Sequence, residues 1–271
     1  MTLEYHHLYG PSVPEKGWVP APSFLLRRDR IHRLLADSHP GLLLEIGCGA
    51  GTLLHELSRR GFTCEAMETS TAALEIANYV NSGEAIIHSV PQPDWEGKFD
   101  YLLSFEVLEH IEDDRNALAL WYSWLKPGGT IILSVPAHMK KWTASDIWAG
   151  HYRRYEMQQL ADLITESGFA IESTETYGFP LSNALLLLRA RVHARDLVGR
   201  NALANDRARN NDMSGVERSA ESRLYPLLKS FPGVMAMRLA LFLQDMSAKK
   251  NWGTGYLLLA RKQHGQATQP E

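Results

Sequence analysis

Apolar residues along this chain group into short runs that alternate with segments of helical periodicity. Residues 41–47, GLLLEIG, form the continuous apolar run that a buried parallel strand needs, and a helical pattern at 52–61 follows it. The alternation continues with strands expected at 62–68, 85–90, 99–105, 130–136 and 169–179, and with helices at 22–36, 71–80, around 118–125 and at 157–166. Such alternation predicts an α/β fold with a mostly parallel sheet that is covered on both faces.

The regular pattern ends near residue 180. Apolar residues recur at helical spacing in 181–199, which predicts an amphipathic helix. Residues 199–215 are polar and predict a mobile loop, and a second helical stretch at 220–245 is expected to be interrupted at Pro226 and Pro232. A last strand is expected at 254–260.

These elements predict one domain over residues 1–271. We divide it into an N-terminal lid and helix (1–40), a cofactor-binding core (41–180), a helical insertion (181–250), the last strand (251–262) and a disordered tail (263–271).

Composition and charge exclude several classes of protein. With 45% apolar and 22% charged residues, the chain of 271 residues is not disordered as a whole. A net charge of −3 gives no support for nucleic-acid binding, and two cysteines, Cys48 and Cys64, cannot form a disulfide scaffold or a structural zinc site. No apolar run is long enough to cross a bilayer, and the first residues lack a secretory signal pattern. We therefore expect a cytoplasmic protein.

The most informative segment is Glu45-Ile46-Gly47-Cys48-Gly49-Ala50-Gly51. Three glycines between a strand and a helix let the backbone turn tightly and approach a ligand closely. Glu68 ends the next strand, where α/β nucleotide folds place a carboxylate on ribose hydroxyls. A dinucleotide fingerprint needs glycine where this chain has Thr52, and a phosphate loop needs a lysine that is missing. The turn therefore suits a nucleoside without a pyrophosphate.

These residues resemble the class I S-adenosylmethionine-dependent methyltransferases, especially the small-molecule group that includes the ubiquinone-pathway O-methyltransferases. The matching pieces are E-I-G-C-G-A-G (45–51), Glu68, F-D-Y-L-L-S-F-E-V-L-E-H-I (99–111) and L-K-P-G-G-T (125–130), within residues 20–180. The resemblance implies a Rossmann-like sheet of seven strands, mostly parallel with the last strand antiparallel, and a helical insertion before that strand.

The resemblance also implies the cofactor S-adenosyl-L-methionine and a set of residues that bind it. Glu45 would order the glycine turn around the methionine part, Glu68 would hold the ribose hydroxyls, and Phe105 and Glu106 would line the pocket. The full set assigned to the cofactor is Glu45, Gly47, Cys48, Gly49, Gly51, Glu68, Thr69, Ser89, Phe105 and Glu106. Many relatives carry an acidic residue near the adenine amine, where this chain has His88-Ser89-Val90.

Candidate catalytic residues follow the fourth and fifth predicted strands of the core. His110, after the fourth, could accept a proton from an attacking hydroxyl, or it could order its loop. The acidic residues around it, Glu109, Glu112, Asp113 and Asp114, read as a solvated helix start, so no metal is expected.

A second group of candidates lies in residues 145–155, whose pattern S-D-x-x-x-G-H-x-R-R-Y is similar to one in methyltransferases of glycan, lipid and natural-product pathways. The candidates for acceptor binding are Tyr9, Trp18, Asp146, His151, Arg153, Arg154 and Tyr155. His151 and the arginines could bind an anionic or polyhydroxyl acceptor; alternatively, Asp146 pairs with Arg153 or Arg154 and holds the loop. Tyr9 and Trp18 could form an aromatic lid or pack on the surface.

We expect methyl transfer to a small-molecule acceptor, through a hydroxyl or carboxyl group, in natural-product, lipid or glycan metabolism. His110 is the first candidate for the base and His151 the second. Two alternatives stay open: a different outcome with the same cofactor, such as ring closure or aminocarboxypropyl transfer, and a non-catalytic binding protein. The expected partner is a small molecule, without nucleic acid or a membrane span, although residues 181–200 leave a peripheral membrane contact open. The sequence leaves the oligomeric state undetermined.

Overall fold

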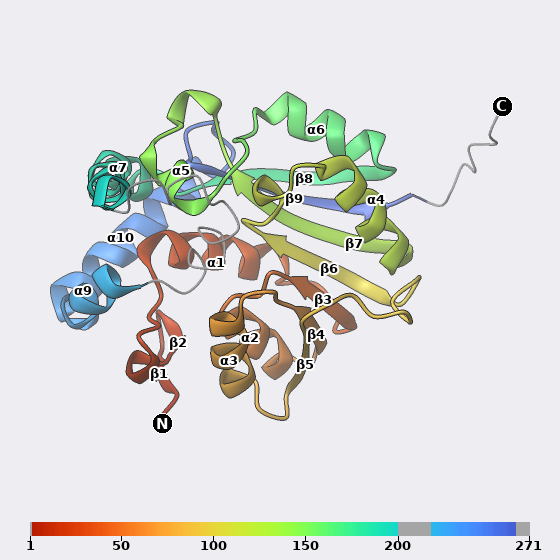
Figure 1. The fold of residues 1–271 in the computed structure, drawn as a ribbon, viewed down its shortest axis with the longest axis horizontal. Helices are drawn as coiled ribbons and strands as arrows, with labels where there is room; N and C mark the ends of the chain where they lie inside the picture. Colours follow the sequence, from red (N-terminus) through yellow and green to blue (C-terminus); the bar gives the residue numbers. More distant parts are fainter. Residues whose placement is uncertain (1, 200–217, 264–271) are drawn as a thin grey trace.

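A seven-stranded sheet forms the centre of the computed structural model, which describes residues 2–199 and 218–263. The strand order is β5-β4-β3-β6-β7-β9-β8, and β9 runs antiparallel to both of its neighbours (Figure 1). The strands are β3 (Leu42–Ile46), β4 (Thr63–Met67), β5 (Ala85–His88), β6 (Phe99–Phe105), β7 (Leu125–Pro136), β8 (Phe169–Tyr177) and β9 (Gly255–Lys262). The predicted fold class is confirmed.

Helices cover both faces of this sheet because successive strand residues point to opposite sides. Leu44 and Leu102 pack with the helices α4 (Asp114–Trp124) and α6 (Met157–Glu166). Leu43 and Leu103 pack on the other face with α1 (Pro22–Leu34) and α2 (Thr52–Arg59). The helix α3 (Thr71–Val80) begins at Ser70, whose side chain accepts a hydrogen bond from the Ala73 backbone. The core of the molecule therefore has two apolar layers.

The N-terminal segment is a small hairpin, β1 (Glu4–His6) and β2 (Gly10–Ser12), followed by the turn η1 (Pro14–Lys16). Val13 and Trp18 pack with residues of α3. Tyr9 lies against Tyr225 in the helical insertion, with ring centroids 6.4 Å apart. The hairpin segment thus contacts both the insertion and α3.

Several predicted boundaries need correction. The strand β7 starts at Leu125, five residues before the expected strand at 130–136. Its pairing with β6 is irregular between the pairs Phe99–Leu125 and Tyr101–Thr130. A short helix, α5 (Ala144–Ala149), follows the turn η3 (Met139–Lys141) and was not predicted. The turn η2 (Leu108–His110) precedes α4.

The insertion consists of α7 (Leu181–Gly199), α9 (Ser219–Lys229) and α10 (Phe231–Ser247). The prediction that Pro226 interrupts the helical stretch is wrong: Pro226 lies inside α9 at an exposed position, and the helix continues past it without the one backbone hydrogen bond that proline cannot donate. The break falls at Ser230, and Pro232 occupies the first turn of α10. The predicted loop at 199–215 and tail at 263–271 lie almost wholly outside the described residues.

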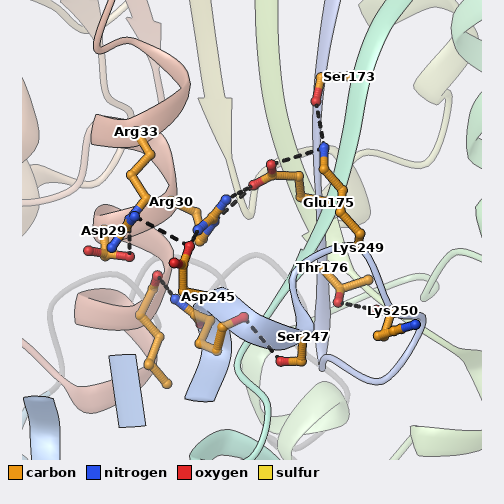
Figure 2. A network of polar contacts seen from close by, with 12 residues as sticks. Asp29, Arg30, Arg33, Ser173, Glu175, Thr176, Asp245, Ser247, Lys249 and Lys250 are labelled. Atoms are coloured by element: carbon orange, nitrogen blue, oxygen red, sulfur yellow. Dashed lines mark hydrogen bonds and ion pairs between the residues drawn. The ribbon is translucent and has the colours of Figure 1, made fainter. Parts of the chain in front are cut away.

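A buried arginine attaches the insertion to the sheet. Arg30 on α1 donates to Glu175 of β8 from Nε (2.8 Å) and Nη2 (2.6 Å), and its Nη1 donates to Asp245 of α10 at 2.6 Å (Figure 2). The Arg30 side chain is 8% exposed. Beside it the fully buried Gln244 donates to the Leu26 carbonyl and accepts from the Gly178 backbone. Three elements far apart in the sequence therefore meet at one guanidinium group.

We expect Arg30→Met to lower the free energy of unfolding by about 3–5 kcal/mol, because the substitution leaves the Glu175 carboxylate buried with one exposed partner, Lys249. Urea unfolding measures the effect. Arg261→Met, which breaks an exposed pair with Glu172, is the control and should cost less than about 1 kcal/mol. Equal stability of Arg30→Met and wild type would mean that apolar contacts alone hold α10.

Candidate functional site

A cavity of about 860 Å³ opens at the carboxyl ends of β3, β4, β6 and β7. Its walls come from the turns after these strands and from α1, α5 and α7. Ligands of open α/β sheets bind at this edge. The predicted residues that line the cavity are Trp18, Glu45, Gly47, Cys48, Gly49, Glu68, Thr69, Phe105, Glu106, His110, Asp146, His151 and Arg154.

The glycine turn after β3 has a backbone that other residues rarely adopt. Gly47, Gly49 and Gly51 have φ angles of 69°, 55° and 67°. A Cβ atom on Gly47 would also lie 2.5 Å from Val107 Cγ2, so this position has no room for a side chain. Gly51 shapes the turn as the N-cap of α2, without lining the cavity.

Glu68 holds this turn in place. Its Oε2 accepts from the Gly49 backbone at 2.8 Å, and its Oε1 accepts from the backbone N–H groups of Thr69 (2.8 Å) and Ser70 (2.9 Å). A carboxylate offers about four acceptor positions, so capacity remains for hydroxyl groups of a ligand. The structure therefore gives Glu68 a role in the order of the turn that the sequence did not predict.

Polar groups without partners lie beneath the turn. Glu45 is buried, and its Oε2 has no hydrogen-bond partner among the described residues. Burial raises the pKa of this carboxyl group to about 8, against the opposing effect of Arg27 and with a contribution from Glu68. Arg27 of α1 lines the cavity, and its buried Nε is likewise unpartnered in the described part of the chain. Buried polar groups normally find partners, so this end of the cavity suits a polar, charged ligand.

Glu106 follows β6 in a conformation that is unusual for a non-glycine residue, with φ 58°. Its Oε1 accepts hydrogen bonds from Ser134 Oγ (3.1 Å) and from the Tyr177 hydroxyl, and Arg27 Nη1 lies 4.0 Å away. These contacts fix the carboxylate at the cavity wall. Strained backbone of this kind often occurs at functional sites.

Two histidines meet on the other side of the cavity. The rings of His110 and His151 are perpendicular, with centroids 4.7 Å apart. His151 Nδ1 lies 3.1 Å from Asp146 Oδ1, and Arg154 donates to both oxygens of Asp146 at 2.7 and 3.0 Å. Burial would raise the pKa of Asp146, but the hydrogen bonds from His151 and Arg154 outweigh it and lower the pKa. Arg154 is therefore a structural partner of Asp146.

Glu109, also beside these histidines, is fully buried, and neither of its carboxylate oxygens has a hydrogen-bond partner within residues 2–199 and 218–263. Burial, with the nearby Glu106, raises the pKa of Glu109 well above its ordinary value. Glu109, His110 and His151 each have one possible metal-ligand atom, and these three atoms lie within 4.8 Å of one another. A divalent transition metal could bind to such a set. The other acidic residues have structural roles: Asp113 caps α4, and Asp114 binds Arg153.

Besides Gly51, four predicted site residues do not line the cavity. Tyr9 is buried, and its hydroxyl donates to the Leu228 carbonyl at 2.7 Å. Arg153 pairs with Asp114, and the Tyr155 hydroxyl donates to the same carboxylate at 2.9 Å. Ser89 is exposed on the turn after β5. The first three are occupied by long-range contacts that the sequence pattern does not reveal.

Other cavity residues were missed. From α1 come Ser23, Phe24 and Arg27, from α5 comes Trp148, and from α7 come Arg189 and His193. Trp148 stacks on His193 with centroids 4.3 Å apart. The signal for Arg27 was its place among the apolar residues of the first predicted helix, since an arginine there must reach either solvent or a buried partner.

Comparisons with known proteins agree with this architecture. The Methyltransferase domain family matches residues 23–174. A ubiquinone biosynthesis O-methyltransferase of Burkholderia thailandensis is 27% identical over 209 residues, covering 72% of this chain and 88% of that protein. The Alkalilimnicola ehrlichii enzyme of that name is 30% identical over 40% of this chain, and the match spans about half (47%) of its own length.

Solved structures show the same fold. The cyclase SpnF has a TM-score of 0.56 at 20% identity, covering 97% of this chain and 89% of its own. Phosphoethanolamine N-methyltransferase 2 of Haemonchus contortus, solved with S-adenosyl-L-methionine, has a TM-score of 0.53 at 17% identity and covers 88% of this chain and 52% of its own. The predicted class of enzyme and its S-adenosylmethionine cofactor are consistent with these matches. Because the family match extends over more than half of its length, the chain belongs to the methyltransferase domain family.

Proposed function

We propose that this chain transfers the methyl group of S-adenosylmethionine to a hydroxyl group of a small-molecule acceptor, with His151 as the general base. The observation that carries the proposal is the hydrogen-bonded pair of Asp146 and His151, which lines the same cavity as Glu68 and the glycine turn. The relatives named O-methyltransferases support a hydroxyl acceptor.

The residues around the glycine turn suit the cofactor. Glu68 would accept from the ribose hydroxyls. Glu45 and Arg27, whose Oε2 and Nε atoms have no hydrogen-bond partner in the described part of the chain, would receive the amino and carboxylate groups of the methionine part. When bound, the cofactor supplies a methyl group on a sulfonium, which is already activated for transfer. The protein therefore needs chiefly to position the acceptor, exclude water and remove one proton.

The hydrogen bonds favour His151 over His110 as the base and reverse the order that the sequence suggests. With the Asp146 carboxylate as acceptor, His151 carries its proton on Nδ1 and its lone pair on Nε2, which lies 3.8 Å from Glu109 Oε1. Arg154 holds the Asp146 carboxylate in place. Burial, together with His151, lowers the pKa of His110 to about 3. A group with so low a pKa has little tendency to take a proton at neutral pH.

In the proposed reaction the acceptor oxygen would give its proton to His151 Nε2 as it forms a bond to the methyl carbon, while the bond from that carbon to the sulfonium sulfur breaks and its electron pair stays on sulfur. Asp146 stabilises the imidazolium, because its carboxylate stays charged beside Nδ1–H. The proton then leaves to solvent, and S-adenosylhomocysteine is the second product.

The first test is the identity of the products. With S-adenosylmethionine and a panel of hydroxylated metabolites, mass spectrometry should find S-adenosylhomocysteine and an acceptor that has gained one methyl group. S-adenosylhomocysteine, but not NAD, should raise the melting temperature. Methylthioadenosine would indicate transfer of the other arm, and an altered acceptor without cofactor turnover would indicate ring closure.

Glu68→Gln should weaken the binding of S-adenosylhomocysteine by about 1–3 kcal/mol in calorimetric titration, because a charged acceptor of hydrogen bonds is lost. Glu75→Gln, on the exposed side of α3, is the matched control and should bind normally. Unchanged affinity of Glu68→Gln would remove Glu68 from the cofactor site.

His151→Gln should lower kcat by about 10²–10⁴-fold, with normal affinity for S-adenosylhomocysteine, as expected for a lost base. His110→Gln changes the neighbouring ring and should lower kcat much less. Steady-state kinetics with the acceptor identified in the first test measure both variants. Full kcat in His151→Gln together with a large loss in His110→Gln would make His110 the general base, as the sequence suggests.

The low pKa of His110 also has a consequence for stability. The unfolded chain binds a proton at His110 near pH 6.5 and the folded chain near pH 3, so this group makes folding less favourable as the pH falls below neutral. Between about pH 7 and about pH 5, wild type should lose about 1–2 kcal/mol more than His110→Gln in urea unfolding. His39→Gln, which removes an exposed histidine, should behave like wild type. Parallel pH profiles of wild type and His110→Gln would contradict the low pKa.

A further inference from the structure

The helices α9 and α10 expose an unusual number of large apolar side chains. We call these residues the apolar face; they are Leu224, Leu227, Phe231, Met235, Leu239, Phe242, Leu243 and Met246. Phe231 is 79% exposed, Met246 69% and Phe242 61%. The opposite side of α10 is buried through Met237, Ala240 and Gln244. A surface helix normally turns polar residues to solvent, so α10 exposes the side that such a helix would bury.

Basic residues occur in the same stretch of chain as the apolar face, and two of them are paired with carboxylates, Lys229 with Glu4 and Lys249 with Glu175. Residues 220–250 contain five basic side chains, Arg223, Lys229, Arg238, Lys249 and Lys250, and all five are exposed. The same stretch has two acidic side chains: Asp245, which binds Arg30 and Arg33, and the half-buried Glu221. This local positive charge contrasts with the net charge of −3 of the whole chain.

We propose that the apolar face docks onto the surface of a lipid bilayer that contains anionic lipids. Apolar side chains flanked by basic ones suit the boundary between acyl chains and negatively charged headgroups. A second copy of the chain is a poorer occupant, because a two-fold contact through this face would bring two surfaces of the same positive charge together.

The shape of the helix pair favours a position along the bilayer surface. No single helix within residues 2–199 and 218–263 is long and apolar enough to cross a membrane. The stretches Glu221–Lys229 and Phe231–Ser247 pass that test only together, and they are bent by 96°. Arg30 and Gln244 fix the inner side of α10 to the body of the protein, so the apolar face keeps its outward direction.

The helices that carry the apolar face lie next to the cavity. In Figure 1, α7, α9 and α10 lie at one end of the molecule, away from α4 and α6. Val192 of α7 is half exposed and lines the cavity, and Glu221 of α9 lines it as well. An acceptor with an apolar tail could therefore reach the cavity from the bilayer. The sequence left a peripheral membrane contact open at residues 181–200, and this inference places such a contact on α9 and α10.

Vesicle flotation tests the proposal with the full chain and needs neither cofactor nor acceptor, so its outcome is independent of methyl transfer. Wild type should float with vesicles of phosphatidylcholine mixed with phosphatidylglycerol, and much less with pure phosphatidylcholine. The double substitution Leu239→Gln and Phe242→Gln should lower partitioning by about tenfold or more, since two large apolar side chains lose their burial in lipid. High salt or Arg238→Glu should weaken binding to the anionic vesicles.

Ile86→Gln is the matched control: Ile86 is 61% exposed on β5, away from the apolar face, and the variant should float like wild type. Circular dichroism should show all variants folded. The proposal is overturned if wild type fails to float with anionic vesicles, if it floats equally with both kinds, or if the double variant floats as well as wild type. Light scattering that shows a dimer separated by the double substitution, without flotation of wild type, would assign the face to a second copy.

Discussion

The guanidinium group of Arg30 determines how the two parts of this protein fit together. It joins β8 and α10 to α1, and α1 also carries Phe24 and Arg27 into the cavity. The helical insertion and the cavity wall therefore share one support. Because a buried charge is costly without its partners, the carboxylates of Glu175 and Asp245 must both stay close, and the position of α1 follows from theirs.

The strands and the glycine turn between residues 41 and 105 could be predicted because their physical causes are local. Buried parallel strands require continuous apolar runs, and the turn at Gly47 requires a residue that accepts positive φ. The positions of Tyr9 and Arg153 could not be predicted, since each depends on a partner that only the folded chain brings near. Pro226 was also predicted wrongly. Whether a helix continues through a proline, which donates no backbone hydrogen bond, is decided by the fold around it.

The two histidines show why the site was only half predictable. Sequence position puts both at the same edge of the sheet, and nothing in their spacing separates them. Their surroundings do: Asp146 orients His151, whereas His110 is buried against another imidazole. The partners of a titratable group, more than its place along the chain, decide whether it can act as a base.

The buried carboxyl group of Glu45 connects ligand binding to the pH of the solution. With its pKa raised to about 8, this group holds a proton for much of the time at neutral pH. A positively charged ligand group beside it favours the ionised form, so binding at this end of the cavity expels a proton. Affinity for such a ligand would then rise as the solution becomes more alkaline, because Glu45 would exchange its proton for the bound cation.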